Sequence, residues 1–335
     1  MTLIYHDDDG DVSILDGKRV GVFGFGNMGR PSALNLRDSG VELIVCDPNP
    51  ERVTMAREEG FQVVPIEQAA QQVDILMPLV RDEALPRMYL DYISPHLRRG
   101  QTLIFSSAYN IKFGFVEPPA FVDVGLVSAR TVGTAVRDRY LSGEGFASFV
   151  AVAQDTSRKA WQTVLAIARA MGALRGGAIE IQFEQEAELD LFMQQAILPI
   201  FHMAVMTAAK LLMEKGYSPE AVFTELYLSG ETSDYLKHAS FQGMNNALKL
   251  QSLTAQYGAL SRHERFSDLK MERLMEVSLE EIRSGKFAQE WAREFNADYP
   301  RLRALLKARE KMDMWELEQQ TIEALRRDVN RFDFD

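Results

Sequence analysis

The sequence contains a single cysteine, Cys46, and only five histidines among its 335 residues. One thiol cannot close an internal disulfide, and so few scattered Cys and His residues exclude a Cys/His zinc framework. Positive charge is also scarce, because 37 Lys and Arg residues stand against 48 Asp and Glu residues, a net charge of −11. A surface of that sign repels phosphate backbones, so we expect no nucleic-acid partner. The lone thiol fits a reducing, cytoplasmic location.

A long hydrophobic run without polar interruption is missing as well. The longest apolar stretch, residues 196–213, approaches the length of a membrane span but contains Pro199, His202 and Lys210. We therefore predict that it is a buried helix of a soluble domain, and we expect no membrane partner. The N-terminal residues are acidic where an export signal would be basic, so we expect no export signal.

The chain does contain enough apolar residues, 46% of the total, for about two domains. Strand-like and helical segments alternate in the first half, which predicts an α/β domain of the Rossmann type, with a doubly wound and mostly parallel sheet, over residues 1–182. The strand-like segments are residues 19–25, 42–46, 74–77, 101–105, 122–127 and 148–152. Beyond them, apolar residues fall at helical spacing, which predicts an all-α domain over residues 183–335.

The sequence Gly24-Phe25-Gly26-Asn27-Met28-Gly29 is a G-x-G-x-x-G motif between the first predicted strand and a predicted helix over residues 28–39. The first glycine permits a tight turn, the second lets the backbone approach a diphosphate, and the third lets helix and strand pack closely. The helix N-terminus adds unpaired N–H groups and the positive end of its dipole. We therefore predict that these six residues bind a dinucleotide; the alternative is a glycine-rich turn without a ligand.

An acidic residue, Asp47, ends the second predicted strand, 21 positions after Gly26. A carboxylate there can accept hydrogen bonds from the adenosine ribose hydroxyls and would repel a 2′-phosphate. NAD(H) is therefore favoured over NADP(H). Arg52, five residues further on, lies within reach of a phosphate and is the argument for NADP(H).

Further landmarks spread along the chain carry a resemblance to a known family. They are residues 15–20 (LDGKRV), 33–40 (ALNLRDSG), 110–114 (NIKFG), 190–192 (DLF), 254–258 (TAQYG) and 284–291 (SGKFAQEW). With them the chain resembles the shorter-chain ketol-acid reductoisomerases along nearly its whole length. The resemblance implies a Rossmann domain followed by a knotted, all-helical domain that forms a homodimer. It also implies an enzyme that uses two Mg²⁺ ions to migrate an alkyl group in an acetohydroxy acid and then reduces the new ketone with a nicotinamide cofactor.

The magnesium site that the resemblance implies is altered in this chain. Asp190 stands at the first ligand position, but Gln194 replaces the glutamate that the family has one helical turn later. The family also has two glutamates four residues apart on a later helix. In this chain only one glutamate of such a pair is present, Glu225 or Glu231 depending on the alignment, and the sequence leaves this register open. We predict Asp190, Glu225 and Glu231 as the metal-ligating candidates. An amide contributes no charge, so we expect too little negative charge for two Mg²⁺ ions.

Three other positions point to the substrate. Ser107 stands where the family has a histidine, Arg130 where it has a lysine, and Ser252 matches a serine that touches the substrate carboxylate. Arginine binds carboxylates bidentately, so Arg130 and Ser252 are predicted to orient a small carboxylate-bearing substrate. Ser107, Tyr109 or a remaining carboxylate would relay a proton. Ser107, Arg130, Asp190, Gln194 and Ser252 are thus the predicted catalytic residues.

Three functions remain open at this point. The first is a nicotinamide-dependent oxidoreductase that acts on a C=O or C=N group next to a carboxylate, without the full two-metal isomerisation. The second is a true ketol-acid reductoisomerase, which converts acetolactate to dihydroxyisovalerate. The third is a non-catalytic relative that keeps the dinucleotide pocket. The altered metal positions favour the first.

Overall fold

The structure is a computed structural model that describes residues 2–266 and 270–325. It divides into two compact units, Met1–Asp190 and Leu191–Asp335. The change from strands to helices falls between strand β9, Ala178–Glu180, and helix α8, Phe183–Phe192. Phe183 and Ala187 of α8 are buried in the core of the first unit, so most of this helix packs with the sheet that precedes it.

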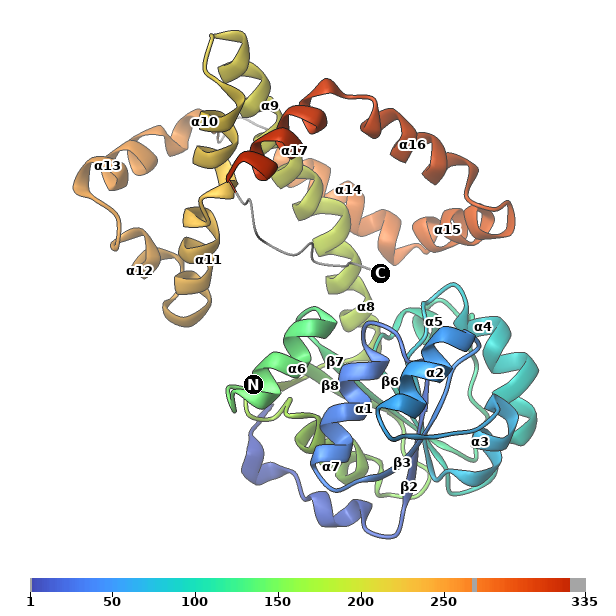
Figure 1. Ribbon diagram of the computed structural model, residues 1–335. Helices are drawn as coiled ribbons and strands as arrows, with labels where there is room; N and C mark the ends of the chain where they lie inside the picture. The colour runs from blue at the N-terminus through green and yellow to red at the C-terminus, as the bar shows by residue number, and fades with distance from the viewer. Residues whose placement is uncertain (1, 267–269, 326–335) are drawn as a thin grey trace. The chain divides into compact units, whose positions relative to one another are not determined.

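Within the described residues, the first unit is built on a nine-stranded sheet in the order β1-β9-β8-β7-β6-β5-β2-β3-β4 (Figure 1). The strands are β1 Ile4–Tyr5, β2 Arg19–Phe23, β3 Glu42–Cys46, β4 Gln62–Val63, β5 Ile75–Pro78, β6 Thr102–Phe105, β7 Asp123–Ala129, β8 Ser148–Gln154 and β9. Neighbours from β4 to β7 pair in parallel, whereas β8 is antiparallel to β7 and β1 to β9. This confirms the predicted α/β fold with a mostly parallel, doubly wound sheet.

The order of the sheet identifies where a ligand would bind. From β2 the chain moves outward through β3 and β4, then returns to pair β5 with the other side of β2. In doubly wound sheets, ligands bind outside the carboxyl ends of the strands, at the point where the order reverses. The glycine motif follows β2 directly, and Ser107 and Arg130 follow β6 and β7, so all of them lie at this edge.

All six predicted strands are present, within one or two residues of their predicted ends. The sequence missed β1, β4 and β9, which have only two or three residues each. An alternation of apolar and polar side chains cannot be recognised over so short a segment. The predicted helix over residues 28–39 is α1, Gly29–Asp38.

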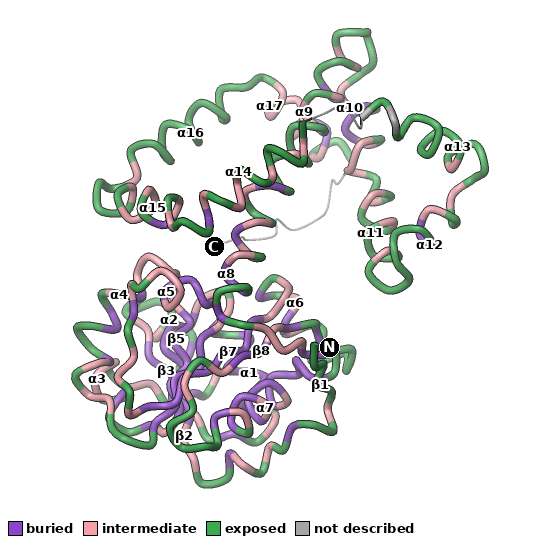
Figure 2. The backbone as a smooth tube through the Cα atoms, turned by 180° about the vertical axis from the view of Figure 1, so that it is seen from behind, coloured by how far each residue is buried: buried purple, intermediate pink, exposed green. Residues whose placement is uncertain are grey.

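Apolar side chains fill both faces of the sheet, and Figure 2 shows the buried residues concentrated there. One face packs against α1, α2 (Pro50–Glu58), α6 (Gly133–Leu141) and α7 (Ala160–Met171). The other packs against α3 (Ile66–Gln72), α4 (Leu85–Met88) and α8. Cys46 is part of the second core, and burial raises the pKa of its thiol, so that this cysteine is an unreactive core residue.

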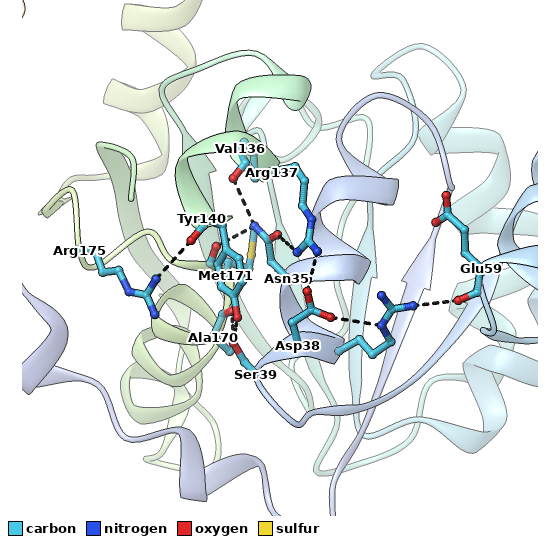
Figure 3. Close-up of polar contacts among 11 residues, drawn as sticks. Asn35, Asp38, Ser39, Glu59, Val136, Arg137, Tyr140, Ala170, Met171 and Arg175 are labelled. Carbon is cyan, nitrogen blue, oxygen red and sulfur yellow. Dashed lines mark hydrogen bonds and ion pairs between the residues drawn. The ribbon is translucent and has the colours of Figure 1, made fainter. Parts of the chain in front are cut away.

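A buried polar network ties α1 to α6 and α7 (Figure 3). The side chain of Asn35, fully buried in α1, donates to the carbonyls of Val136 at 3.3 Å and Met171 at 3.0 Å. Its oxygen accepts a hydrogen bond of 2.9 Å from Arg137, which also pairs with Asp38 at 2.5 Å. Buried amides cost free energy unless they are paired, so this network specifies one position of α6 on α1.

The second unit is helical. Its described elements include α9 (Leu198–Glu214), α10 (Pro219–Phe223), α11 (Glu231–Gln242), α12 (Met244–Leu248), α13 (Leu253–Arg262), α14 (Met271–Arg283), α15 (Lys286–Asn296), α16 (Pro300–Glu310) and α17 (Asp313–Leu325). This confirms an all-helical second part; the knot stays a prediction of the resemblance.

The prediction of a buried helix over residues 196–213 is wrong for the single chain. In α9 only Ala209 is buried, whereas Phe201, Met203 and Leu211 expose 44%, 60% and 53% of their surface. Residues of α10 and α17 pack against α9 around Ala209, and several other apolar side chains of α9 stay exposed. Of the described helices, one segment, Phe183–Glu214, is long and apolar enough to cross a membrane by length and composition.

Candidate active site

The glycine motif forms a loop that only glycine permits at two positions. Gly24 has a φ of +108°, in the region that L side chains rarely adopt, and its N–H donates to the Cys46 carbonyl at 2.7 Å. A Cβ on Gly29 would lie 1.8 Å from the carbonyl oxygen of Gly24. The loop therefore turns sharply out of β2 and leads directly into α1, whose N-terminus lies at the ligand-binding edge of the sheet.

Asp47 fastens this loop. Its Oδ2 accepts a hydrogen bond of 2.6 Å from the Phe25 N–H, and its Oδ1 accepts one of 2.7 Å from the Asn49 N–H. The carboxylate is only 2% exposed, and the Arg52 guanidinium lies 4.0 Å away. The same guanidinium lies 3.2 Å from where a Cβ on Gly26 would be. Asp47 and Arg52 thus lie beside the glycine loop; their contacts with a cofactor stay predictions.

The start of α6 also contacts the loop, a feature that the sequence did not suggest. An added Cβ on Gly133 would lie 1.8 Å from the carbonyl oxygen of Asn27 and 2.5 Å from its side-chain oxygen. The Asn35 network fixes α6 on α1, so neither partner can withdraw without breaking buried hydrogen bonds. Gly133 therefore permits a contact that supports the conformation of the dinucleotide loop.

We expect Gly133→Ala to raise the KM for the dinucleotide about tenfold or more, because the Cβ would displace the loop at Asn27. The measurement is initial-rate kinetics at saturating substrate, with isothermal calorimetry for cofactor affinity. Gly258→Ala is the matched control, since its Cβ meets nothing within 4 Å in α13. Equal cofactor affinities in the two variants would show that Gly133 does not support the dinucleotide loop.

Three charged side chains meet beyond the carboxyl end of β7. Arg130 donates to Glu186 at 3.2 Å and to Asp190 at 2.6 Å. The two carboxylates are four residues apart on α8, so they project from the same helix face. Ser128 and the Ala108 N–H also donate to Glu186, at 2.7 and 2.8 Å. The structure thus brings the predicted residues Arg130 and Asp190 together. Arg130 also contacts Glu186, a residue for which the sequence predicted no role.

Three of the four acidic side chains of α8 form ion pairs and do not belong to a solvated face. Glu186 is only 2% exposed, and Glu188 pairs with Lys112 at 2.5 Å. Burial raises the pKa of Glu186, and the hydrogen bonds from Ala108 and Ser128 oppose that shift. The spacing of Glu186 four residues before Asp190 was the signal that could have identified it.

Asp82 lies near this cluster, after the carboxyl end of β5. Burial, and then the charges of Glu186 and Glu83, raise its pKa to about 7, although a hydrogen bond from Ser107 lowers it. The buried Asn110 side chain donates to the Asp82 carbonyl at 3.0 Å. Asp82 is therefore a half-buried carboxyl group in contact with Ser107 that can hold a proton near neutral pH.

The remaining predicted residues belong to the second unit. Gln194, four residues after Asp190, lies in a π-helical turn, Met193–Ile197. Glu225 lies in a second π-helical turn, Thr224–Leu228, and Glu231 begins α11 after Gly230. The two glutamates are exposed and lie on different helical segments, so neither forms a pair four residues apart on one helix. Ser252 caps α13 by accepting a hydrogen bond of 3.2 Å from the Ala255 N–H.

A magnesium pair requires several carboxylate oxygens in near-octahedral positions. Among residues 2–266 and 270–325, no group of three or more His, Cys, Asp or Glu side chains is placed to hold a metal ion. Asp190 is bound to Arg130, Gln194 carries no charge, and Glu225 and Glu231 do not form a pair. Within the described residues of the single chain, these positions therefore do not offer the paired carboxylates that two divalent cations require.

Comparison with known proteins covers almost the whole chain. The family described as acetohydroxy acid isomeroreductase, NADPH-binding domain, matches residues 14–177, and the ketol-acid reductoisomerase C-terminal domain matches residues 183–327. Among the relatives is the ketol-acid reductoisomerase (NADP(+)) of Methanopyrus kandleri, 40% identical over 88% of this chain and 89% of its own length. That of Pyrobaculum aerophilum is 36% identical over 92% of this chain and 94% of its own length.

A solved structure extends the likeness to three dimensions. The NADH-preferring ketol-acid reductoisomerase from an uncultured archaeon superimposes with a TM-score of 0.91, at 31% identity, over 98% of this chain and 100% of its own. A semialdehyde dehydrogenase NAD-binding protein from Cupriavidus necator superimposes with a TM-score of 0.60 at 18% identity, which shows a shared fold alone.

Proposed function

The chain belongs to the ketol-acid reductoisomerase family, and from that membership we propose that it transfers hydride between a nicotinamide dinucleotide and a small 2-oxo acid. As a member it is an NAD(P)-dependent oxidoreductase. The observation that carries the proposal is the glycine loop. It is hydrogen-bonded to Asp47, is contacted by Gly133, and lies at the edge of the sheet where Ser107 and Arg130 also lie. A bound nicotinamide would supply or accept the hydride at that edge.

The residues at this edge support a division of tasks. The loop and the N-terminus of α1 would bind the diphosphate, and Asp47 the adenosine ribose. Reduction of a ketone leaves a negative oxygen that needs a proton. We propose that the Ser107 hydroxyl delivers it and is reprotonated by Asp82, with which it is hydrogen-bonded. Arg130 and Ser252 remain the residues proposed to orient the substrate carboxylate.

We propose NADH as the preferred cofactor. Pro48, Asn49, Pro50 and Glu51 line a shallow open cavity beside Asp47, on the segment where an adenosine ribose would lie. The carboxylates of Asp47 and Glu51 would oppose a 2′-phosphate there. The similar structure from an uncultured archaeon is NADH-preferring, whereas the relatives from Pyrobaculum and Methanopyrus are named for NADP(+). The test is the ratio of kcat/KM for the two reduced cofactors.

Glu51→Gln is expected to raise kcat/KM for NADPH about fivefold and to change that for NADH less than about twofold, because it removes one exposed negative charge worth roughly 1 kcal/mol. Steady-state kinetics with both cofactors measure the effect. Glu58→Gln, at the exposed far end of the same helix, is the control and should change neither value. An equal gain in both variants would show that the effect is one of net charge alone.

Two candidate reactions share the hydride step. In the complete reaction, the methyl group of acetolactate moves to the neighbouring carbonyl carbon, the former hydroxyl becomes the new ketone, and hydride then reduces that ketone. The comparisons favour this candidate, because the relatives from Methanopyrus and Pyrobaculum are named ketol-acid reductoisomerase. The alternative is reduction alone, which the ion pairs of Arg130 and the neutral Gln194 favour.

One substrate comparison separates them. Acetolactate requires migration before reduction, whereas 3-hydroxy-3-methyl-2-oxobutanoate is the migrated ketone and requires reduction only. Consumption of NADH with both, in the presence of Mg²⁺, supports the complete reaction, and consumption with the second alone supports reduction. A panel of 2-oxo acids and their imines extends the test. Dinucleotide binding by calorimetry without turnover of any of them would leave the non-catalytic relative as the function.

We also propose that the chain is a homodimer through its helical unit and not a membrane protein. A second copy would cover the exposed apolar side chains of α9, such as Phe201 and Met203. Sedimentation of the purified protein without detergent tests this. A monodisperse dimer is expected, and a monomer, or a protein that needs detergent to stay in solution, would contradict it.

A further inference from the structure

The charge between Glu186 and Asp190 is already compensated by a side chain of the chain itself. The Arg130 guanidinium contacts both carboxylates, at 3.2 and 2.6 Å, and it also lies over the Phe149 ring at 5.1 Å. Arginine is always charged, and its planar fork matches carboxylates in a way that a lysine ammonium does not. Arg130 thus compensates part of the negative charge of these two carboxylates.

We propose that Asp190 and Gln194 do not hold magnesium in this chain, because the Arg130 guanidinium occupies the Asp190 carboxylate and Gln194 carries no charge, so that the chain reduces its substrate without magnesium. This inference rests on the proposed function, the hydride step, and deepens it. The family resemblance places a metal ligand at residue 190, and in this structure that carboxylate contacts a guanidinium. A metal ion would have to displace Arg130 or lie next to a like charge.

The burial of the three groups supports the assignment. Glu186 is 2% exposed and is held by the Ala108 N–H and Ser128, so it cannot turn away from Arg130 toward another cation. Arg130 is 26% and Asp190 38% exposed, so these two border the open edge where a substrate would approach. In this arrangement Arg130 fixes the direction of Asp190 and supplies the positive charge that a substrate carboxylate or a developing oxyanion would meet.

Metal binding to the full-length protein tests the proposal without reference to activity. Mn²⁺ is the probe, titrated with detection by electron paramagnetic resonance. We expect no site in the wild type with a Kd below about 1 mM, and a gain in affinity of about tenfold or more in Arg130→Gln, which releases the two carboxylates. Adding Asp190→Asn should abolish that gain. Unchanged Mn²⁺ binding in a folded Arg130→Gln variant would overturn the proposal.

The wild type alone provides a second test, should Arg130→Gln fail to fold. Reduction of 3-hydroxy-3-methyl-2-oxobutanoate should change less than about twofold between excess EDTA and excess Mg²⁺. A wild-type Mn²⁺ site with a Kd below about 1 mM that Asp190→Asn removes, or a loss of activity of about tenfold or more in EDTA, would overturn the proposal. If no substrate is reduced under any condition, the proposed function fails, while the Mn²⁺ titration still decides the role of Arg130.

Discussion

Glu186→Ala is expected to lower the free energy of unfolding by about 3–5 kcal/mol, the largest loss that we predict for a single substitution. The buried carboxylate accepts hydrogen bonds from Ala108, Ser128 and Arg130. Alanine would remove the acceptor for all three donors and leave the Arg130 charge half compensated. The measurement is thermal and urea unfolding followed by circular dichroism.

The same helix supplies the control for this substitution. Glu184 is exposed on α8, two residues from Glu186, and Glu184→Ala has the same effect on intrinsic helix propensity. Its cost should stay within about 0.5 kcal/mol. Glu186→Gln keeps the shape of the side chain and should lose less than Glu186→Ala. If Glu184→Ala and Glu186→Ala destabilise the protein equally, the Glu186 cluster does not stabilise the fold.

The Glu186 cluster shows what the sequence could not predict. Arg130 and Asp190 were each recognisable at their own positions, but they lie 60 residues apart and only the fold joins the end of β7 to α8. Glu186 was hidden in an acidic run, because a pattern of charges does not say which of them face the sheet. Asp82 carries no motif at all, and its raised pKa comes from burial first and then from the charges of Glu186 and Glu83, which only the fold brings near it.

The long strands and the glycine loop were predictable because their patterns are local. Alternation, turn chemistry and the position of a glycine motif act over a few residues, and they predicted β2, α1 and β3 almost to the residue. Helix α9 shows the limit of such patterns. A run of apolar side chains predicts that other protein atoms cover the helix. The covering atoms can belong to the core of the same chain or to the surface of a second copy. The exposed Phe201 and Met203 exclude a core of the same chain.

Asp82 should make the stability of the protein depend on pH in the direction opposite to that of most carboxylates. Its pKa in the folded protein is about 7, mainly because of burial and then because of Glu186, whereas in an unfolded chain the pKa has its ordinary value of 3.8. Between these two values the folded state holds a proton that the unfolded state releases. Stability is therefore fully present below about pH 4 and is lost as the pH rises toward 7.

The expected loss follows from the same linkage. Each unit of pKa difference corresponds to about 1.4 kcal/mol, so ionisation of Asp82 should cost roughly 3–4 kcal/mol by pH 8. The measurement is the difference in unfolding free energy between wild type and Asp82→Asn from pH 4 to pH 8. The wild type should lose stability relative to the variant across this range and level off above about pH 7. A constant difference would contradict a raised pKa.

Asp38→Asn is the control with the opposite sign. Burial acts to raise the pKa of Asp38, but the hydrogen bond and charge of Arg137 outweigh it, and the net pKa is lowered. Its contribution to stability is thus present above its unfolded pKa and is lost only as the pH falls below about 4. If Asp82 also reprotonates Ser107, kcat for the reduction should fall above about pH 7 in the wild type, and Asp82→Asn should lower kcat and remove that decline while Asp38→Asn keeps it.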